Sequence, residues 1–158
     1  MRDSLLRRFL RLFRSLGVGA LASAVDFLGL VCLVEVLGLE AGVYRYVPAG
    51  HRLVRHGGGD ARGAVARAAL LQRWIADAPA ILVLVGFTER SAAKYGDRAP
   101  RYVHMEVGHA AQNVYLQAEA LGLGTCVVGA FHDGQLKRVL ALPEAAAPLA
   151  LLPVGTPR

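Results

Sequence analysis

The chain has 158 residues, enough for one ordinary domain with a hydrophobic core. Hydrophobic residues make up 54% of it and charged residues only 19%, a balance that excludes intrinsic disorder. The net charge of +6 is concentrated at the start, because residues 1–15 hold five arginines and a single aspartate. The basic balance therefore does not predict a nucleic-acid-binding surface. The high apolar content predicts instead that part of the chain contacts lipid.

Residues 1–40 are typical of a membrane-directed segment. Leucine and phenylalanine alternate with arginine at roughly helical spacing over residues 5–14, which indicates a basic amphipathic start. Residues 16–39 are almost wholly apolar and long enough to cross a hydrocarbon core. Arginine on the N-terminal side keeps that end in the cytoplasm. We therefore expect a cytoplasmic protein with a hydrophobic, transmembrane-length helix at 16–39 that can tether it to the cytoplasmic face of the inner membrane.

Two acidic residues interrupt this apolar run and keep other interpretations open. Asp26 and Glu35 would each cost several kcal/mol at the bilayer centre if unpaired. A cleaved signal peptide could use the small residues at 22–24 as its cleavage site. A buried or interfacial helix of a soluble protein is the other alternative.

Short stretches of the same segment carry a family resemblance. Arg8-Phe9-Leu10-Arg11, the small apolar residues at 18–22, and Val25-Asp26-Phe27 resemble the first transmembrane helix of GtrA-like small membrane proteins. That family uses four such helices and this chain has one. We therefore do not carry the family's transport-like role over, and a gene fusion or truncation is one explanation of the resemblance.

Cysteine and histidine spacing gives no reason to expect a metal site. Cys32 and Cys126 lie far apart, each in an apolar run, so they predict buried small hydrophobic side chains in a reducing compartment. His104 and His109 are five residues apart, which separates them by about 140° around a helix and prevents them from sharing an ion.

From residue 41 onward the pattern changes to that of a mixed α/β domain. Residues 43–47 and 51–55 alternate apolar and polar side chains around a Pro-Ala-Gly turn, which predicts a β-hairpin. After a glycine-rich loop, Asp60 is placed to cap an alanine-rich helix over 62–77. We expect one face of this helix to be buried, through Val65, Ala69, Leu70 and Ile75.

The remaining elements follow from apolar runs and from helical periodicity. They are a strand buried on both faces over 80–87, a loop or broken helix over 88–101, a long helix over 102–121, a buried strand over 125–128, a short helix over 133–140 capped by Asp133, and a closing strand over 149–154. The glycine-rich loop lacks the Lys-Ser/Thr ending of a P-loop, and Gly122-Leu123-Gly124 precedes a strand, the wrong order for a dinucleotide-binding fingerprint.

Six short motifs follow one another over residues 41–158. They are Gly42-Val43-Tyr44-Arg45-Tyr46, Lys94-Tyr95, Gly108-His109 with Gln112-Asn113, Gly122-Leu123-Gly124, Val127-Val128-Gly129-Ala130-Phe131 and Leu152-Pro153-Val154-Gly155. Their order and spacing resemble the SagB/ThcOx-type branch of the FMN-dependent nitroreductase family. The resemblance implies an α+β fold, a partial nitroreductase-like three-layer α/β/α sandwich that lacks the family's N-terminal part and carries the N-terminal hydrophobic helix. It also implies FMN bound at a homodimer interface.

The resemblance assigns cofactor-binding roles to the segment after the predicted strand at 125–128. Val127 and Val128 would line the face of the flavin ring, and the backbone N–H groups of Gly129 and Ala130 would donate hydrogen bonds near flavin N5 and O4. Such donors stabilise the charge of the reduced ring. A tight strand-to-helix turn that needs glycine for its conformation alone is the alternative.

Lys94-Tyr95 resembles the Lys-Tyr pair of the peptide-azoline dehydrogenases in this branch. There, hydride passes from a thiazoline or oxazoline ring to FMN while a base removes a proton from the neighbouring carbon. Lys94 would be the base if burial lowers its pKa, and Tyr95 would donate or relay a proton. An exposed lysine beside an aromatic at the domain edge is the alternative. The substrate would be a peptide or a related small molecule.

The family's phosphate-binding arginine-serine segment has no counterpart here, and Arg158 could help to hold the FMN phosphate. The leading functional hypothesis is therefore an FMN-dependent dehydrogenase. A non-catalytic membrane-tethered binding or scaffold protein, derived from a gene fusion or truncation, is the alternative from another class. A third is a GtrA-like membrane component with an unrelated extension.

Overall fold

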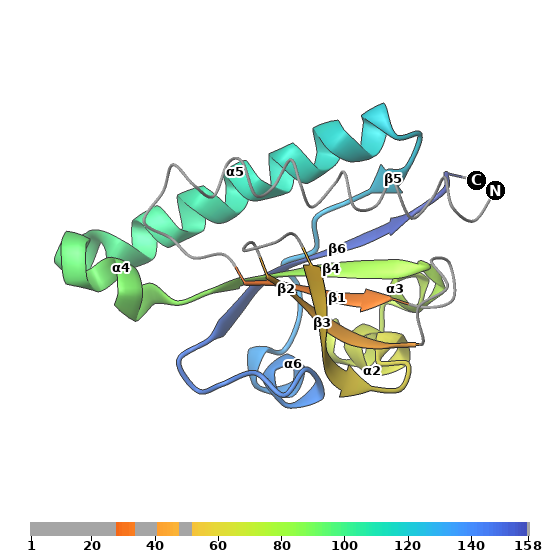
Figure 1. Cartoon of the computed structure of the whole chain (residues 1–158), viewed down its shortest axis with the longest axis horizontal. Helices are drawn as coiled ribbons and strands as arrows, with labels where there is room; N and C mark the ends of the chain where they lie inside the picture. The colour runs from red at the N-terminus through yellow and green to blue at the C-terminus, as the bar shows by residue number, and fades with distance from the viewer. Residues whose placement is uncertain (1–27, 34–40, 48–51, 158) are drawn as a thin grey trace.

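A six-stranded antiparallel sheet organises the molecule. The computed structural model describes residues 28–33, 41–47 and 52–157 (Figure 1). The strand order is β3-β2-β1-β4-β6-β5, and every neighbouring pair is antiparallel. The strands are β1 (Leu28–Leu33), β2 (Gly42–Val47), β3 (Arg52–Gly58), β4 (Ala80–Gly86), β5 (Gly124–Thr125) and β6 (Ala147–Gly155). The helices are α2 (Arg62–Ala68), α3 (Trp74–Asp77), α4 (Thr88–Tyr95), the 3-10 turn η1 (Gly96–Arg98), α5 (Ala99–Ala120) and α6 (Asp133–Val139).

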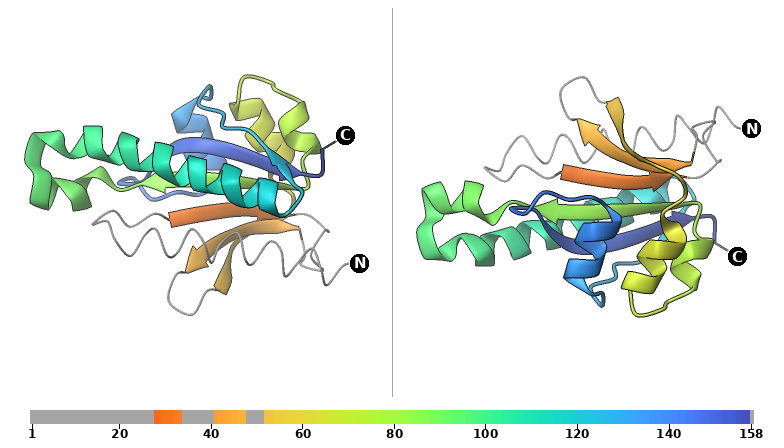
Figure 2. Two further views of the ribbon diagram at one scale, coloured as in Figure 1. Left: turned by 90° about the horizontal axis from the view of Figure 1, so that it is seen from above. Right: turned by 90° about the horizontal axis from the view of Figure 1, so that it is seen from below.

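Helices cover both faces of the sheet, which confirms the expected three-layer α/β/α arrangement of an α+β fold. In Figure 2, α5 crosses one face, and α2, α3 and α6 lie on the other. β4 is buried along its whole length, as its uninterrupted apolar run predicts. Leu82 and Leu84 belong to the core under α5, whereas Ile81 and Val83 belong to the core under the three shorter helices. Alternate side chains of one strand therefore supply two separate cores.

The long helix α5 confirms the helix predicted over 102–121 and begins three residues earlier, at Ala99. Its buried side chains follow helical periodicity: Val103, Val107, Ala111, Val114 and Ala118. They pack on the sheet together with Tyr44 and Tyr46 of β2, whose hairpin with β3 is also as predicted. For residues 88–101 the sequence predicts a loop or a broken helix. The broken helix is the form present, because α4 and η1 occupy residues 88–98.

The hydrophobic helix predicted over 16–39 is wrong for residues 28–33. These residues form β1, which pairs antiparallel with β2 on one side and β4 on the other. A central strand of a sandwich is as continuously apolar as a membrane helix, so composition and length cannot tell them apart. The rest of the predicted segment, and all the residues that carry the GtrA-like resemblance, lie outside the described residues. No helix in the described part of the chain is long and apolar enough to cross a bilayer.

The single helix predicted over 62–77 is two helices joined by a tight corner. α2 ends at Ala68, and the backbone at Leu70 and Leu71 takes left-handed φ angles of 56° and 61°. Leu70 is 52% exposed instead of buried, whereas Ile75 reaches the core through α3. Gln72 closes the corner, because its side-chain amide donates a hydrogen bond to the Ala69 carbonyl at 2.9 Å. Alanine-rich periodicity does not show such a corner.

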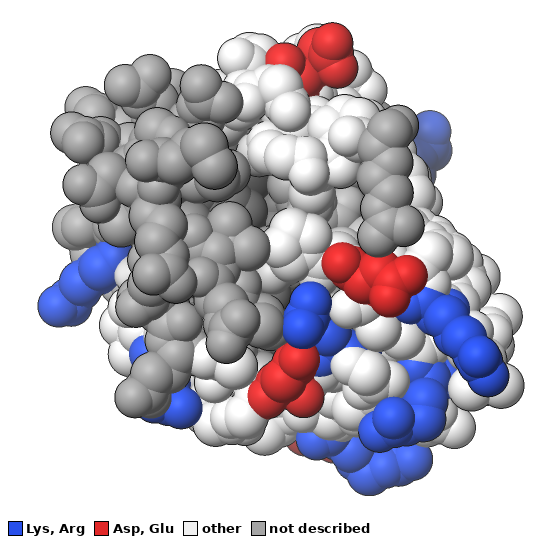
Figure 3. Space-filling model, turned by 90° about the vertical axis from the view of Figure 1, so that its right-hand side faces the viewer, with Lys and Arg blue, Asp and Glu red and all other residues white. Residues whose placement is uncertain are grey.

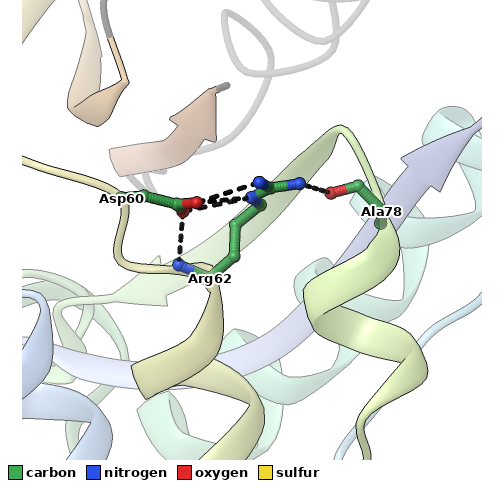
Figure 4. A network of polar contacts seen from close by, with 3 residues as sticks. All are labelled: Asp60, Arg62 and Ala78. Carbon is green, nitrogen blue, oxygen red and sulfur yellow. Dashed lines mark hydrogen bonds and ion pairs between the residues drawn. The ribbon is translucent and has the colours of Figure 1, made fainter. Parts of the chain in front are cut away.

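Asp60 and Arg62 tie the start of α2 to the turn before β4 (Figure 4). Asp60 accepts hydrogen bonds from the Arg62 backbone N–H at 3.0 Å and from the Arg62 guanidinium at 2.9–3.2 Å. The same guanidinium donates to the Ala78 carbonyl at 3.0 Å. The Arg62 side chain therefore lowers the pKa of the Asp60 carboxyl below its ordinary value, chiefly by hydrogen bonding. The N-cap residue of α2 is Ala61, so Asp60 lies one residue before the N-cap and accepts the hydrogen bond from the Arg62 N–H from there.

At the other end of the chain, the predicted helix and closing strand are present as α6 and β6. α6 begins at Asp133, but His132 is its N-cap residue and no side chain caps it, so the predicted capping role of Asp133 is wrong. β6 runs from Ala147 to Gly155 and pairs with β4 along most of its length. Its position places Leu149 and Ala150 beneath α5.

Candidate functional site

A cavity of about 400 Å³ lies between α5 and β6. This volume falls within the range of small-molecule sites. One wall is the side of α5, and the opposite wall combines β6 with the segment that follows β5. The side chains and backbone around the cavity include His104, Gly108, Gln112, Tyr115, Val127 and Leu149.

Gly108 leaves the α5 side of the cavity without a side chain at its position. It lies in the middle of the helix, and a Cβ added there would meet nothing within 4 Å. Because glycine weakens a helix by about 1 kcal/mol relative to alanine, its presence here is unfavourable for the helix itself. The open space beside Gly108 belongs to the cavity, so the missing side chain leaves room for a ligand against α5.

The segment after β5 differs from the buried strand predicted over 125–128. β5 is only two residues long, Val127 is 49% exposed, and Cys126 is exposed, so the predicted burial of this cysteine is wrong. Val128 alone is buried and forms an isolated bridge, its N–H donating to Leu151 O at 2.8 Å and its carbonyl accepting from Leu151 N–H at 3.0 Å. The apolar run at 125–128 does not reveal this, because apolar composition alone does not show that the strand stops at Thr125 and that only Val128 of the following residues turns toward the sheet.

Partial desolvation affects the Cys126 thiol even though the residue is exposed. Burial raises the pKa of this thiol, which keeps it protonated at neutral pH. A protonated thiol is a poor nucleophile and a poor metal ligand. Within the described residues, no three His, Cys, Asp or Glu side chains lie together in a way that could hold a metal ion.

The two residues after this bridge are Gly129 and Ala130, the predicted hydrogen-bond donors to a flavin. Among the described residues, none accepts a hydrogen bond from the backbone N–H of Gly129 or Ala130. Both residues are exposed, and a Cβ at Gly129 would meet nothing within 4 Å. Two adjacent, unpartnered N–H groups beside an open approach fit a ligand that presents hydrogen-bond acceptors, as the N5–O4 edge of a flavin does. Of the predicted flavin contacts, Val127 lines the cavity, whereas Val128, Gly129 and Ala130 are not among its lining residues. The donors suit such an edge by their chemistry, and their role in binding a flavin stays a prediction.

Two further residues of this region were missed by the sequence analysis. The Tyr115 hydroxyl oxygen accepts a hydrogen bond from the Val127 N–H at 2.7 Å, and the Gln72 amide donates to the Ala130 carbonyl at 3.3 Å. Sequence carried little signal for either, because the partners are 12 and 58 residues away along the chain. Tyr115 could have been suspected from its place on α5, one turn after the buried Ala111.

Lys94 and Tyr95 lie at the end of α4, away from the cavity lining. Lys94 is exposed, and its Nζ lies 5.2 Å from the Tyr95 ring centroid. Tyr95 packs edge-on against Tyr102, with ring centroids 5.0 Å apart. Neither Lys94 nor Tyr95 is among the described residues that line the cavity. In Figure 1, α4 projects beyond the end of the sheet, so the pair is carried on an extension of the fold. Arg158 lies outside the described residues.

Charge on the surface is mixed. On the face shown in Figure 3, acidic side chains lie among the basic ones, so Lys and Arg do not form an uninterrupted positive surface there.

The comparisons with known proteins identify the family. The family model described as "Nitroreductase family" matches residues 30–156. The chain belongs to the nitroreductase family. It is 50% identical over 121 residues to MJ1384, a nitroreductase-family protein of Methanocaldococcus jannaschii, a match that covers 77% of this chain and 60% of the relative. The chain thus spans about 60% of the length of this relative.

Several solved structures share the fold. One from Anabaena variabilis superposes with a TM-score of 0.78 at 33% identity, covering 84% of this chain and 27% of that one. The NADPH:FMN oxidoreductase of Vibrio harveyi superposes with a TM-score of 0.54 at 28% identity. The match covers 61% of this chain and 46% of that one. The Escherichia coli microcin synthetase McbBCD complex with truncated pro-MccB17 superposes with a TM-score of 0.71 at 22% identity. The match covers 85% of this chain and 53% of that one, and it shows likeness of fold alone.

Proposed function

We propose that this nitroreductase-family chain is an FMN-dependent oxidoreductase of the SagB/ThcOx dehydrogenase type. In this proposal it transfers hydride between a peptide azoline, or a related small molecule, and the flavin. The observation that carries the proposal is that the N–H groups of Gly129 and Ala130 have no acceptor among the described residues and follow Val127, which lines the cavity. An NADPH:FMN oxidoreductase, 28% identical over 61% of this chain, is among the structural neighbours and supports the cofactor. The substrate class rests on the resemblance of Lys94-Tyr95 to the pair in the peptide-azoline dehydrogenases.

The protein's part in this reaction is to bind and to stabilise charge. FMN, when bound, would supply the hydride acceptor. Gly129 and Ala130 would donate backbone hydrogen bonds to its N5–O4 edge, which stabilises the negative charge of the reduced ring. Val127 and Leu149 provide apolar surface in the cavity wall, against which the flavin ring would pack. The absence of a side chain at Gly129 allows the ring to approach the backbone closely.

A homodimer is part of the proposal, because one chain does not bring all the predicted residues together. Lys94, the proposed base, and Tyr95, the proposed proton relay, are not part of the cavity wall in the single chain. The outer side of α5 carries two exposed large apolar side chains, Met105 and Leu116. Exposed apolar side chains on one helix face favour a protein–protein contact. A partner subunit across α5 would cover them and could supply the burial that a lysine base needs.

The first test is flavin retention. The purified chain is incubated with FMN, desalted, and measured by visible absorbance and flavin fluorescence. Retained, spectrally shifted flavin in stoichiometric amount is the expected result. A colourless protein that is folded by circular dichroism would contradict the proposal and favour a non-catalytic binding role.

Two matched glycine variants locate the flavin in the same experiment. Gly129→Val places a side chain in open space, so it should leave the fold intact and weaken FMN binding by at least about tenfold. Gly58→Val is the control in β3, where a Cβ would meet only the flexible end of Arg55 at 3.7 Å. Equal FMN affinities in the two variants would rule out close approach at Gly129.

A further inference from the structure

The segment Val127–His132, which carries the two free N–H groups, is anchored to elements on both faces of the sheet. The hydroxyl oxygen of Tyr115, on α5, accepts a hydrogen bond from the Val127 N–H at 2.7 Å. On the opposite face, the Gln72 side-chain amide donates a hydrogen bond to the Ala130 carbonyl at 3.3 Å. The Ala68 carbonyl accepts a hydrogen bond from the His132 N–H at 2.8 Å. Between these anchors, Val128 is bonded in both directions to Leu151 of β6.

These anchors fix the orientation of the free donors. Gly129 and Ala130 have no side chain that could hold them in place, and their own N–H groups have no acceptor among the described residues. The direction in which those N–H groups point therefore depends on the peptide units before and after them. Rigid, preoriented donors stabilise a developing negative charge more than mobile donors do.

Tyr115 has a second capability that Gln72 lacks. A phenol that accepts one hydrogen bond still has its own proton to donate. Tyr115 lines the cavity, and no described residue accepts its O–H. This proton is therefore available to an acceptor atom of a ligand in the cavity.

We propose that Tyr115 and Gln72 are positioning residues of the flavin site. Tyr115 fixes the N–H of Val127, two residues before Gly129, and Gln72 fixes the carbonyl of Ala130, directly after the second donor. Tyr115 also donates a hydrogen bond to the bound ligand. This inference rests on the proposed function. Neither residue takes part in covalent chemistry.

The test for Tyr115 compares Tyr115→Phe with Tyr102→Phe. Tyr102 is a second partly buried tyrosine of α5, which contacts Tyr95 through its ring and has no hydrogen bond from its hydroxyl to any described residue. Tyr115→Phe should weaken FMN binding by about five- to tenfold, the effect of one lost hydrogen bond. The reduced flavin should lose more affinity than the oxidised flavin, because its negative charge gains more from oriented donors.

The midpoint potential of bound FMN separates positioning from general loss of structure. A tenfold greater loss for the reduced form lowers the two-electron potential by about 30 mV. A merely structural defect weakens both redox states equally and leaves the potential unchanged. If Tyr115→Phe matches Tyr102→Phe in both dissociation constant and potential, Tyr115 is not a positioning residue.

Gln72 is tested by Gln72→Met and Gln72→Glu, neither of which can donate to the Ala130 carbonyl. Both should lower the potential in the same direction as Tyr115→Phe. Gln135→Met, at an exposed position of α6, is the control. A Gln72→Glu variant with wild-type potential would overturn the role of Gln72.

Hydrogen exchange in the ligand-free chain keeps the inference testable if FMN does not bind at all. In that case the proposed function fails, but the anchoring geometry still predicts an outcome. Tyr115→Phe should speed exchange of the Val127 amide, and Gln72→Met that of His132, while the amides of β4 stay protected. Unchanged exchange at Val127 in Tyr115→Phe would show that the anchor does not exist.

Discussion

Leu149 occupies the space that a side chain at Gly86 would need. A Cβ at Gly86 would lie 2.5 Å from Leu149 Cδ1 and 3.0 Å from Val103 Cγ1. Gly86 ends β4, Leu149 belongs to β6, and Leu149 also forms part of the cavity wall. The absence of a side chain at one position in the sheet therefore sets the position of a cavity-lining residue on the next strand.

Gly86→Ala should destabilise the fold by about 1–3 kcal/mol, the usual cost of overpacking a well-filled core. The added methyl group must displace Leu149, so it should also alter the cavity. Urea unfolding gives the free energy of unfolding. Gly63→Ala is the control, because a Cβ there meets only the flexible end of Arg67 at 3.7 Å. Equal unfolding midpoints for the two variants would mean that Leu149 moves aside freely.

Gly108→Leu should separate stability from ligand binding. The substitution replaces the weakest helix former other than proline with a strong one, so the free energy of unfolding should rise by about 0.5–1 kcal/mol. Its side chain would project into the cavity and should reduce FMN binding at least tenfold. Ala120→Leu, at an exposed position near the end of α5, is the control for an added leucine away from the cavity. Unimpaired FMN binding by Gly108→Leu would mean that the ligand does not lie against this part of α5.

Sequence predicts the parts of this fold whose local pattern and tertiary environment agree. β4 is apolar throughout and buried on both faces, and α5 repeats its apolar residues at helical spacing. β1 was assigned to a membrane helix because the apolar run alone does not say whether strands will flank it. The break at Leu70 and Leu71 was missed because two non-glycine residues with left-handed φ angles have no sequence signature.

The candidate site divides in the same way. Gly129 and Ala130 could be selected from sequence, since they lie in a contiguous motif that resembles a known family. Tyr115 and Gln72 act on that motif from other elements, through hydrogen bonds that exist only after the sheet has brought α5 and the α2–α3 corner to the same segment. Side chains that position a site from a distance in sequence leave no local pattern.

Lys94→Met should leave FMN binding unchanged and lower the rate of flavin reduction by an azoline-containing peptide about 10²- to 10⁴-fold, the usual contribution of a general base. Lys94 is exposed in the single chain, with its Nζ 5.2 Å from the Tyr95 ring centroid, so the substitution should not disturb the fold. Arg98→Met, an exposed cation in the adjacent turn η1, controls for loss of positive charge near the substrate. Wild-type rates of flavin reduction in Lys94→Met would remove Lys94 from the mechanism.

The Asp60–Arg62 pair should make stability depend on pH in the acid range. The pKa of Asp60 is lower in the folded chain than its ordinary value of about 3.9. The carboxylate is thus favoured in the folded state, and its contribution is complete above that ordinary value. It is lost as the pH falls from about 4 through the folded pKa, because the unfolded chain binds the proton first. The Asp60 side chain is 42% exposed, so solvent screening limits the contribution to about 1 kcal/mol or less.

Asp60→Asn tests this by removing the titrating group. At neutral pH the variant should unfold at lower urea concentration than the wild type, and the difference should shrink as the pH falls below 4. Glu144→Gln is the control: Glu144 is fully exposed and its carboxylate is 3.9 Å from Lys137 Nζ, a contact that should contribute little. Added salt should reduce the Asp60 effect only in part, because three hydrogen bonds from the Arg62 guanidinium hold the carboxylate in place. A wild-type-to-Asn difference that stays constant from pH 7 to pH 3 would show that the carboxylate charge is not what stabilises this corner.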